Sequence, residues 1–421
     1  MRQLSLFFIV LSLQLSPQFA LANSPWLARE VSVATQKILA NTAAPGAMPG
    51  VVIASPSQMN PNYYYHWIRD AALTMDTMVS LWRTSGDSTQ KQIYQNRILH
   101  YLNFSRNNQT AITLTGLGEP KFCIDGKPYS DAWGRPQNDG PALRAITAIH
   151  FAQVLLQQGQ LSFVKSNLYD GVLPTNSLIK ADLEYVSHHW QDPSFDLWEE
   201  TLGDHFYTRM VQRKALLLGA SLADTLNDHA ASLWYHSQAI AIEASLNNFW
   251  DPNKKYILTT LNRRGGADYK TSNLDIAVIL GALHGGMGDG FFDVSDARVQ
   301  ATMQALEQSF AGLYPLNQRR EPGTALGRYP EDRYNGGGFS GGNPWVLSTL
   351  AAAEYYYRLG ALKRSTSDLA LADAYVQRVA IHAYPDGSLS EQIDRNSGYM
   401  VSASDLTWNY ASVLTTAAAT Q

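Results

Sequence analysis

The spacing of the predicted helices along the chain is the feature that most constrains its fold. Apolar periodicity, helix breakers and capping residues predict about twelve helical segments, while strand-like alternation is scarce. The segments are residues 26–39, 68–83, 89–104, 141–158, 178–190, 205–226, 230–249, 272–283, 296–311, 344–359, 366–382 and 403–416. We expect Pro141 to begin its helix, Gly159 to follow the last turn, and Ser402 with Asp405 to form a capping box.

The connections between these segments alternate in length. Those that lead into even-numbered segments are mostly long, and those that lead out of them are mostly short, with residues 159–177 as the exception. Long irregular loops are uncommon in compact domains and usually functional. Along antiparallel helices this alternation collects the long loops at one end. We therefore predict an all-α fold, an (α/α)6 barrel of six helical hairpins with long active-site loops on one face, formed by one domain over residues 23–421.

An open solenoid of stacked helical pairs would give the same periodicity. The sequence has no recurring stretch at a fixed period, and its loop lengths vary widely. Closure into a barrel is therefore the favoured interpretation.

The first residues predict export. Met1-Arg2-Gln3 gives a short positive start, residues 4–13 are mostly apolar, and Ala20-Leu21-Ala22 matches a signal peptidase site. The apolar run is shorter than the roughly 20 residues that span a bilayer, which argues against a membrane anchor. We expect residues 1–22 to be a cleavable signal peptide of a secreted or periplasmic protein without a membrane span, and the mature chain to be a monomer.

Composition excludes several function classes. Cys123 is the only cysteine, so an intramolecular disulfide is impossible and core packing must hold the fold. The net charge of −4 provides no basic field that would attract nucleic acid. The 22 Tyr and 10 Trp suit a site that grips flat, partly apolar sugar faces.

The first candidate catalytic group lies in Phe195-Asp196-Leu197-Trp198-Glu199-Glu200. Such a cluster is usually a solvated acidic loop. Here, however, aromatic residues flank the acids, just ahead of a helix on the loop-rich face. Crowding by carboxylates and an indole raises the pKa of a glutamate, which would keep Glu199 protonated as a general acid.

The second candidate is Glu391, in Asp386-Gly387-Ser388-Leu389-Ser390-Glu391-Gln392. Its neighbours are polar, which suits a carboxylate that stays ionised and activates water. Two carboxyl groups in contrasting environments are the minimum equipment for glycoside hydrolysis.

Other loops carry residue types that bind ligands. Arg69 and Asp70 follow the aromatic stretch from Tyr63 to Trp67 and suit either sugar hydroxyls or a buried ion pair. Other chemistries are poorly supported. His188 and His189 are adjacent and lack metal-ligand spacing, and the glycines of residues 336–342 lack the Lys-Ser/Thr sequel of a phosphate-binding loop. No G-x-S-x-G elbow or D-D-x-x-D metal motif is present, which disfavours a serine hydrolase and a terpene-cyclase-like enzyme.

Seven stretches, in consistent order, resemble the signature segments of glucoamylases, glycoside hydrolase family 15. They are residues 67–70, 116–122, 133–143, 196–200, 327–334 with 343–345, 390–394 and 405–408.

The resemblance implies an (α/α)6 barrel and an inverting reaction without a metal or organic cofactor. Glu199 matches the general acid and Glu391 the general base of the family. The resemblance also implies a set of substrate-binding residues, which are Tyr63, Trp67, Arg69, Asp70, Trp133, Asp196, Trp198, Glu200, Arg328, Trp345 and Trp408.

The chain also departs from the family pattern. Residues 335–342 are richer in glycine than in fungal members, residues 398–401 differ after the predicted base, and no starch-binding domain follows the last predicted helix. We therefore expect maltooligosaccharides, soluble starch and glycogen as substrates rather than raw granules. The alternatives are an α-1,6-glucosidase, a trehalase, or a non-catalytic glycan-binding barrel.

Overall fold

The computed structural model describes residues 24–421, so the predicted signal peptide, residues 1–22, lies outside the described residues. Helices dominate this part of the chain. The α-helices are α1 (Pro25–Asn41), α2 (Ile68–Thr84), α3 (Ser88–Thr110), α4 (Asp139–Gln157), α5 (Leu161–Asn167), α6 (Leu178–His189), α7 (Phe206–Thr225), α8 (His229–Leu246), α9 (Ala277–Gly285), α10 (Ala297–Ala311), α11 (Val346–Lys363), α12 (Thr366–His382) and α13 (Thr407–Ala418). Short 3-10 turns occupy Gly116–Gly118, Asn247–Phe249 and Pro315–Gln318.

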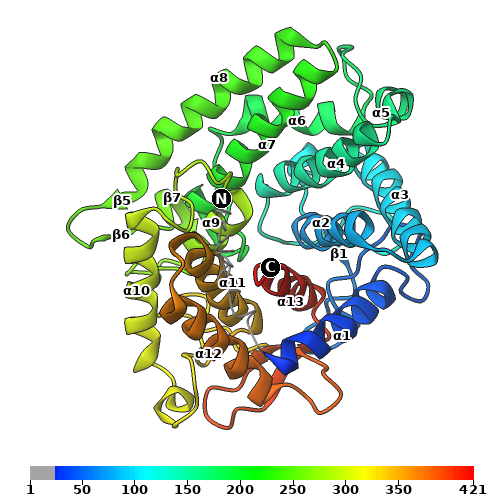
Figure 1. Ribbon diagram of the computed structural model, residues 1–421. Coiled ribbons are helices and arrows are strands. Elements are labelled where there is room, and N and C mark those ends of the chain that lie inside the picture. The colour runs from blue at the N-terminus through cyan, green and yellow to red at the C-terminus, as the bar shows by residue number, and fades with distance from the viewer. Residues whose placement is uncertain (1–23) are drawn as a thin grey trace, which may run out of the picture.

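Six helices close into an inner ring. In the order α2, α4, α7, α9, α11 and α13, each helix contacts the next, and α13 returns to contact α2. The outer helices α3, α6, α8, α10, α12 and α1 pack around that ring (Figure 1). Of these, α6 contacts both α4 and α7, and each of the others packs mainly on one ring helix. The predicted (α/α)6 barrel is therefore confirmed, and the open solenoid is excluded because the ring closes.

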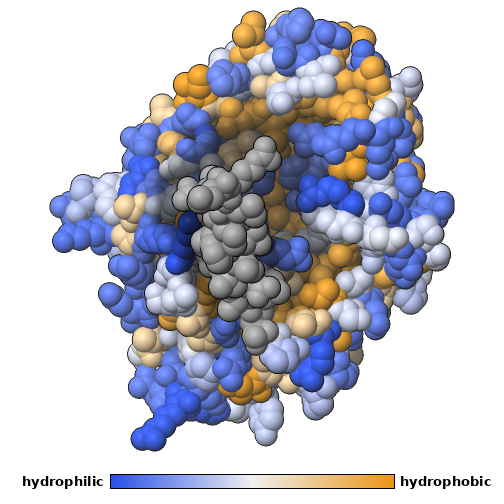
Figure 2. Space-filling model, viewed as in Figure 1, coloured by the Kyte–Doolittle hydropathy of each residue, from blue (hydrophilic) through white to orange (hydrophobic). Residues whose placement is uncertain are grey.

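Burial along the helices follows from this two-layer arrangement. In the inner helix α9 every residue from Ala277 to Leu283 is buried, because α9 packs against the ring helices α7 and α11 and the outer helix α10. In the outer helix α8 the buried residues are Ala231, Tyr235, Ala239, Ile242 and Leu246. Their spacing of three or four places them on one face of the helix, and the other face meets solvent. Figure 2 shows that hydrophilic residues cover much of the outer edge, with hydrophobic residues exposed between them.

The twelve predicted segments correspond to twelve of the helices, and α5 is an addition. It is seven residues long and lies in the connection 159–177 that broke the predicted alternation. Gly159 follows α4 with φ of +76°, as predicted. Pro141 does not begin α4, which starts two residues earlier at Asp139.

The predicted capping box of Ser402 and Asp405 is wrong. Ser402 belongs to a strand, and α13 begins only at Thr407. The side chain of Asp405 accepts hydrogen bonds from Lys37 and Tyr410. Polar residues are common both at helix caps and in short strands. The sequence alone does not distinguish the two, because a short strand is recognised only with its partner strand.

Short antiparallel strands stiffen the long loops. They are β1 (His66–Trp67), β2 (Lys121–Phe122), β3 (Ser194–Phe195), β4 (Thr201–His205), β5 (Trp250–Asp251), β6 (Tyr256–Ile257), β7 (Thr260–Gly266), β8 (Ser390–Ile393) and β9 (Met400–Ser404). The pairs are β1–β2, β5–β6 and β8–β9, and the three-stranded sheet has the order β3-β4-β7. Throughout residues 24–421, no helix has the length and apolar character needed to cross a membrane.

Candidate active site

A pocket of about 670 Å³ opens where five inner helices begin. Its walls come from the long loops that precede α2, α4, α7, α11 and α13, which meet at one end of the barrel as predicted. The predicted site residues that line it are Tyr63, Trp67, Arg69, Asp70, Trp133, Trp198, Glu199, Glu200, Arg328, Trp345, Glu391 and Trp408. Asp196 is the member of the predicted set that lies outside the lining.

Glu199 sits on a tight turn between β3 and β4. Its φ of +68° is a left-handed conformation that non-glycine residues adopt rarely, and such positions cluster at functional sites. The turn is fixed by Asp196, whose Oδ1 accepts hydrogen bonds from the backbone N–H of Glu200 at 2.7 Å and of Thr201 at 3.0 Å. Asp196 therefore supports the loop that presents Glu199 to the pocket, and we infer a structural contribution for it.

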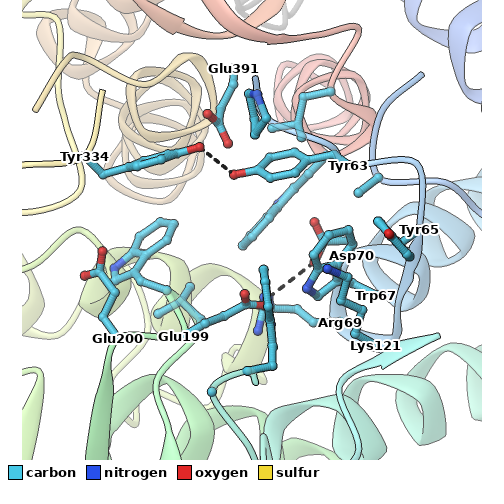
Figure 3. A pocket seen from close by; sticks show the side chains of 18 of the residues that line it. Tyr63, Tyr65, Trp67, Arg69, Asp70, Lys121, Glu199, Glu200, Tyr334 and Glu391 are labelled. Atoms are coloured by element: carbon cyan, nitrogen blue, oxygen red, sulfur yellow. Dashed lines mark hydrogen bonds and ion pairs between the residues drawn. The ribbon is translucent and has the colours of Figure 1, made fainter. Parts of the chain in front are cut away.

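Arg69 is the cation closest to Glu199. Its guanidinium lies 3.2 Å from Glu199 Oε1 and 3.2 Å from Asp139 Oδ2, and donates a 2.8 Å bond to Gln137 (Figure 3). Burial raises the pKa of Glu199 above its ordinary value, although Arg69 opposes this and Asp70 adds to it. The predicted crowding by Asp196 and Glu200 is not the cause.

Arg69 and Asp70 were predicted either to bind sugar hydroxyls or to form a buried ion pair, and the structure shows an ion pair that lines the pocket. Arg69 Nε lies 3.5 Å from Asp70 Oδ2, yet neither buried atom has a hydrogen-bond partner. Burial raises the pKa of the Asp70 carboxyl group. A buried polar atom without a hydrogen bond is costly, and the ion pair between these two atoms offsets part of that cost. Two indole N–H groups of the pocket, those of Trp133 and Trp345, are unpartnered in the same way.

Glu391 lies across the pocket from Glu199, on β8 (Figure 3). It is 1% exposed, and its Oε2 accepts hydrogen bonds from Gln392 Nε2 at 2.9 Å and from the Ser402 hydroxyl. Burial raises its pKa to about 7, and these hydrogen bonds limit the rise. The neighbours are polar as expected, and burial makes the ionised form less favoured than it is in water; that Glu391 acts as an ionised base stays a prediction.

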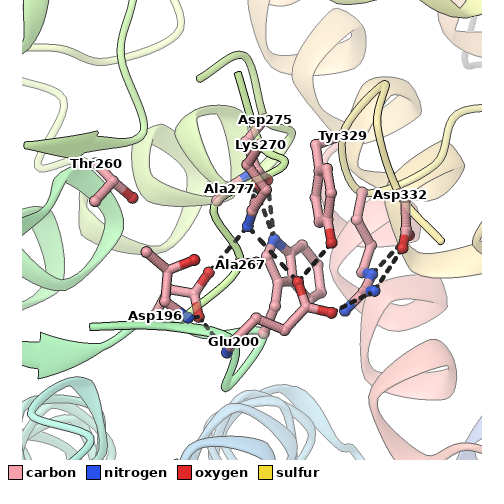
Figure 4. A network of polar contacts seen from close by, with 12 residues as sticks. Asp196, Glu200, Thr260, Ala267, Lys270, Asp275, Ala277, Tyr329 and Asp332 are labelled. Carbon is pink, nitrogen blue, oxygen red and sulfur yellow. Dashed lines mark hydrogen bonds and ion pairs between the residues drawn. The ribbon is translucent and has the colours of Figure 1, made fainter. Parts of the chain in front are cut away.

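A network of charges surrounds Glu200, the residue that follows Glu199 in the chain (Figure 4). Glu200 accepts hydrogen bonds from Arg328 at 2.8 Å and from the Tyr329 hydroxyl at 2.6 Å. The buried ammonium of Lys270 lies 3.1 Å from Asp196 and 3.4 Å from Asp275. The indole N–H of Trp198 donates to Asp275 at 2.9 Å. Most side-chain groups on this wall are therefore already paired, in contrast to Asp70.

Sequence reasoning did not select Lys121, which lines the pocket. Its ammonium is surrounded by four aromatic rings at 3.7–4.5 Å, those of Tyr65, Trp67, Tyr129 and Trp133. Burial lowers its pKa to about 8, although ring faces favour the cation. The signal was available, because residues 116–122 form one of the family-like stretches. Tyr334 and Phe339, from the loop 333–345, also line the pocket and were not selected.

Within residues 24–421, no group of three or more His, Cys, Asp or Glu side chains is arranged to hold a metal ion. His189 instead contacts Asp192 at 2.8 Å, and His188 packs near Trp234. That the reaction needs no cofactor stays a prediction.

Comparison with known proteins agrees with this geometry. The sequence profile of glycosyl hydrolases family 15 matches residues 30–367 and 363–418. The chain belongs to this family. It is 37% identical to a glucoamylase of Blastobotrys adeninivorans, over 92% of this chain and 70% of that protein. It is 38% identical to glucoamylase 1 of Rhizopus oryzae, over 93% and 70% respectively.

Solved structures give the same result. The glucoamylase of Saccharomycopsis fibuligera superposes with a TM-score of 0.82 at 31% identity, over 94% of both chains. The predictions of a family 15 member, an (α/α)6 barrel and a glycoside hydrolase are thus confirmed. The roles of individual site residues remain predictions.

Proposed function

We propose that this family 15 glycoside hydrolase is an inverting, exo-acting α-glucosidase that releases β-glucose from the non-reducing ends of α-1,4-glucans. The observation that carries the proposal is that Glu199 and Glu391 line opposite sides of one pocket (Figure 3). Inversion needs one carboxyl group at the glycosidic oxygen and another that activates water on the opposite face of the sugar. The glucoamylase relatives support the α-1,4-glucan substrate.

The residues divide the work as follows. Glu199 protonates the glycosidic oxygen, and Glu391 takes a proton from the attacking water. Asp70 and Arg69 line the pocket and bind hydroxyls of the terminal glucose. The aromatic walls contact the apolar faces of the sugars and exclude water, which strengthens the electrostatic interactions inside.

The substrates under this proposal are maltooligosaccharides, soluble starch and glycogen, with slower action on α-1,6 links. The N-terminal residues support export to the periplasm or the medium. We further propose that the mature chain is one catalytic domain and works as a monomer without a cofactor.

Proton NMR of the fresh product of maltotriose tests the mechanism. We expect β-glucose first, followed by slow mutarotation. Initial α-glucose would contradict inversion and would require a covalent nucleophile. Rates on maltose, isomaltose and trehalose, measured in parallel, test the linkage. A preference for isomaltose or trehalose would replace the proposed substrate with one of these.

A further inference from the structure

The glycine-rich loop that departs from the family pattern brings an exposed aromatic ring to the pocket. The loop is closed on itself, because Gly341 N–H bonds Arg333 O at 3.0 Å and Gly342 N–H bonds Asp332 O at 2.7 Å. Inside it, the Asn335 side chain donates to Ser340 Oγ at 2.8 Å. These bonds hold Phe339 on a defined loop between Arg328 and α11.

Glycine is required where this loop rests on the strand beside Glu391. Gly336 has φ of +86°, and a Cβ there would lie 2.4 Å from the Cβ of Ser402. Ser402 is the residue whose hydroxyl donates to Glu391. The close approach fixes the loop against β9, so the position of Phe339 is tied to the position of the site.

Phe339 ends a row of aromatic rings that leads out of the pocket. Ring centroids are 5.7 Å apart for Trp198–Trp345, 6.2 Å for Trp345–Tyr334 and 5.9 Å for Tyr334–Phe339. Exposure rises along the row, from 7% for Trp198 and 6% for Trp345 to 71% for Phe339, with Tyr334 between them. Phe339 also lines the pocket, so its uncovered face is continuous with the site.

We propose that Phe339 is the stacking surface for the third glucose residue of a bound α-glucan, counted from the non-reducing end. This inference rests on the proposed exo-acting function, because the third residue is counted from a chain end bound in the pocket. The first residue contacts Asp70 and Arg69, and the second lies beside Glu200 and Arg328. An aromatic ring of this kind offers apolar area to the C–H face of a sugar with little loss of conformational freedom.

The test is the ratio of kcat/KM for maltotriose to kcat/KM for maltose, which lacks a third residue. We expect Phe339→Ala to lower this ratio roughly fivefold, mostly through KM, as for the loss of one apolar contact area. Phe339→Trp should keep the ratio at or above the wild-type value. Leu233→Ala is the matched control, because Leu233 is 74% exposed on α8, away from the pocket, and its loss should leave the ratio unchanged.

Three outcomes of this experiment would contradict the proposal, and each has a different consequence. An unchanged ratio in Phe339→Ala would overturn the stacking role while leaving the proposed function intact. A shift in the pH profile on maltose would overturn it too, because Phe339 would then act through Ser402 and Glu391. If the wild type released glucose from neither maltotriose nor maltose, the proposed function and this inference would both be overturned.

Discussion

The two walls of the pocket surround their carboxyl groups differently, and they bury Glu391, at 1% exposed, more completely than Glu199, whose side chain is 17% exposed. Glu199 faces a cation, the guanidinium of Arg69, at 3.2 Å. Glu391 faces neutral donors, the amide of Gln392 and the hydroxyl of Ser402. Burial raises the pKa of both groups, and for Glu391 it reaches about 7.

The contrast shows that one neighbouring cation does not decide which group acts as the acid. Arg69 also faces Asp139 at 3.2 Å and Asp70 at 3.5 Å, so its single charge is shared among three carboxyl groups. With all three ionised the cluster would carry a net charge of −2, which favours a proton on one of them. Glu199 can therefore hold a proton beside an arginine, while the hydrogen bond from Ser402 and the charge of Arg328 favour the ionised form of Glu391.

The largest expected effect comes from removing each carboxyl group in turn. Glu199→Gln and Glu391→Gln should each lower kcat on maltose by about 10²–10⁴-fold or more. On α-glucosyl fluoride, whose leaving group needs no proton, Glu199→Gln should recover most of its rate and Glu391→Gln should not. Steady-state kinetics on the two substrates measure this directly.

The thermal unfolding midpoint of each variant is the control, and it should stay close to that of the wild type. The reverse pattern, with fluoride turnover kept only in Glu391→Gln, would exchange the two roles. Glu391 would then be the acid and Glu199 the base.

The second prediction tests whether the Glu199 wall depends on charge more than the Glu391 wall does. Burial alone would lower the pKa of Lys270, but Asp196, Asp275 and Glu200 raise it above its ordinary value. Lys270→Met would leave two buried carboxylates uncompensated and should cost about 3–5 kcal/mol of stability. Tyr334→Phe, on the other wall, removes a 3.0 Å bond to Tyr63 and should cost about 1 kcal/mol.

Urea unfolding followed by circular dichroism measures both. Lys127→Met is the matched lysine control, because Lys127 is 79% exposed and its pair with Asp125 contributes little. Equal losses for Lys270→Met and Tyr334→Phe would contradict the difference between the walls.

The barrel was predictable from sequence because its signals are local. A buried face repeats every three or four residues within each helix, and the long connections are visible as gaps between such faces. α5 was missed because seven residues carry too few repeats. The strands of the loops were missed because each is two to seven residues long, and a pair becomes recognisable only when its partner is known.

The sequence predicts which residues line the pocket better than it predicts which of them contact one another. Most predicted residues line the pocket, because the ordered motifs carry them there. Their partners are distant in sequence, as in Arg69–Glu199 and Arg328–Glu200, which are 130 and 128 residues apart. The motifs alone therefore group Asp196 with the substrate ligands, although its side chain stabilises a turn. They also predict a helix cap at Ser402, although its hydroxyl donates to Glu391.

A substitution of Ser402 has the smallest expected effect, and it tests directly how the surroundings of Glu391 set its pKa. Its hydroxyl bonds the ionised form of Glu391 and so lowers the pKa of that carboxyl group. As the proposed base, Glu391 must be ionised, so kcat/KM should fall as the pH drops through about 7 in the wild type. Without the hydroxyl the pKa rises, and the acid limb of the profile moves to higher pH.

Ser402→Ala and Ser402→Gly should therefore both lose a few-fold in kcat/KM at pH 6 and little on the alkaline side of the limb. They differ in the backbone, because Ser402 has φ of +70°, which glycine adopts without strain. If the acid limb of the kcat/KM profile shifts in both variants, the shift is due to the loss of the hydrogen bond from Ser402 to Glu391. A shift in only one assigns it to the backbone, and an unmoved limb in both would mean that it reports a group other than Glu391. The Arg69 cluster is the first place to look for that group, because burial raises the pKa of both Glu199 and Asp70 there.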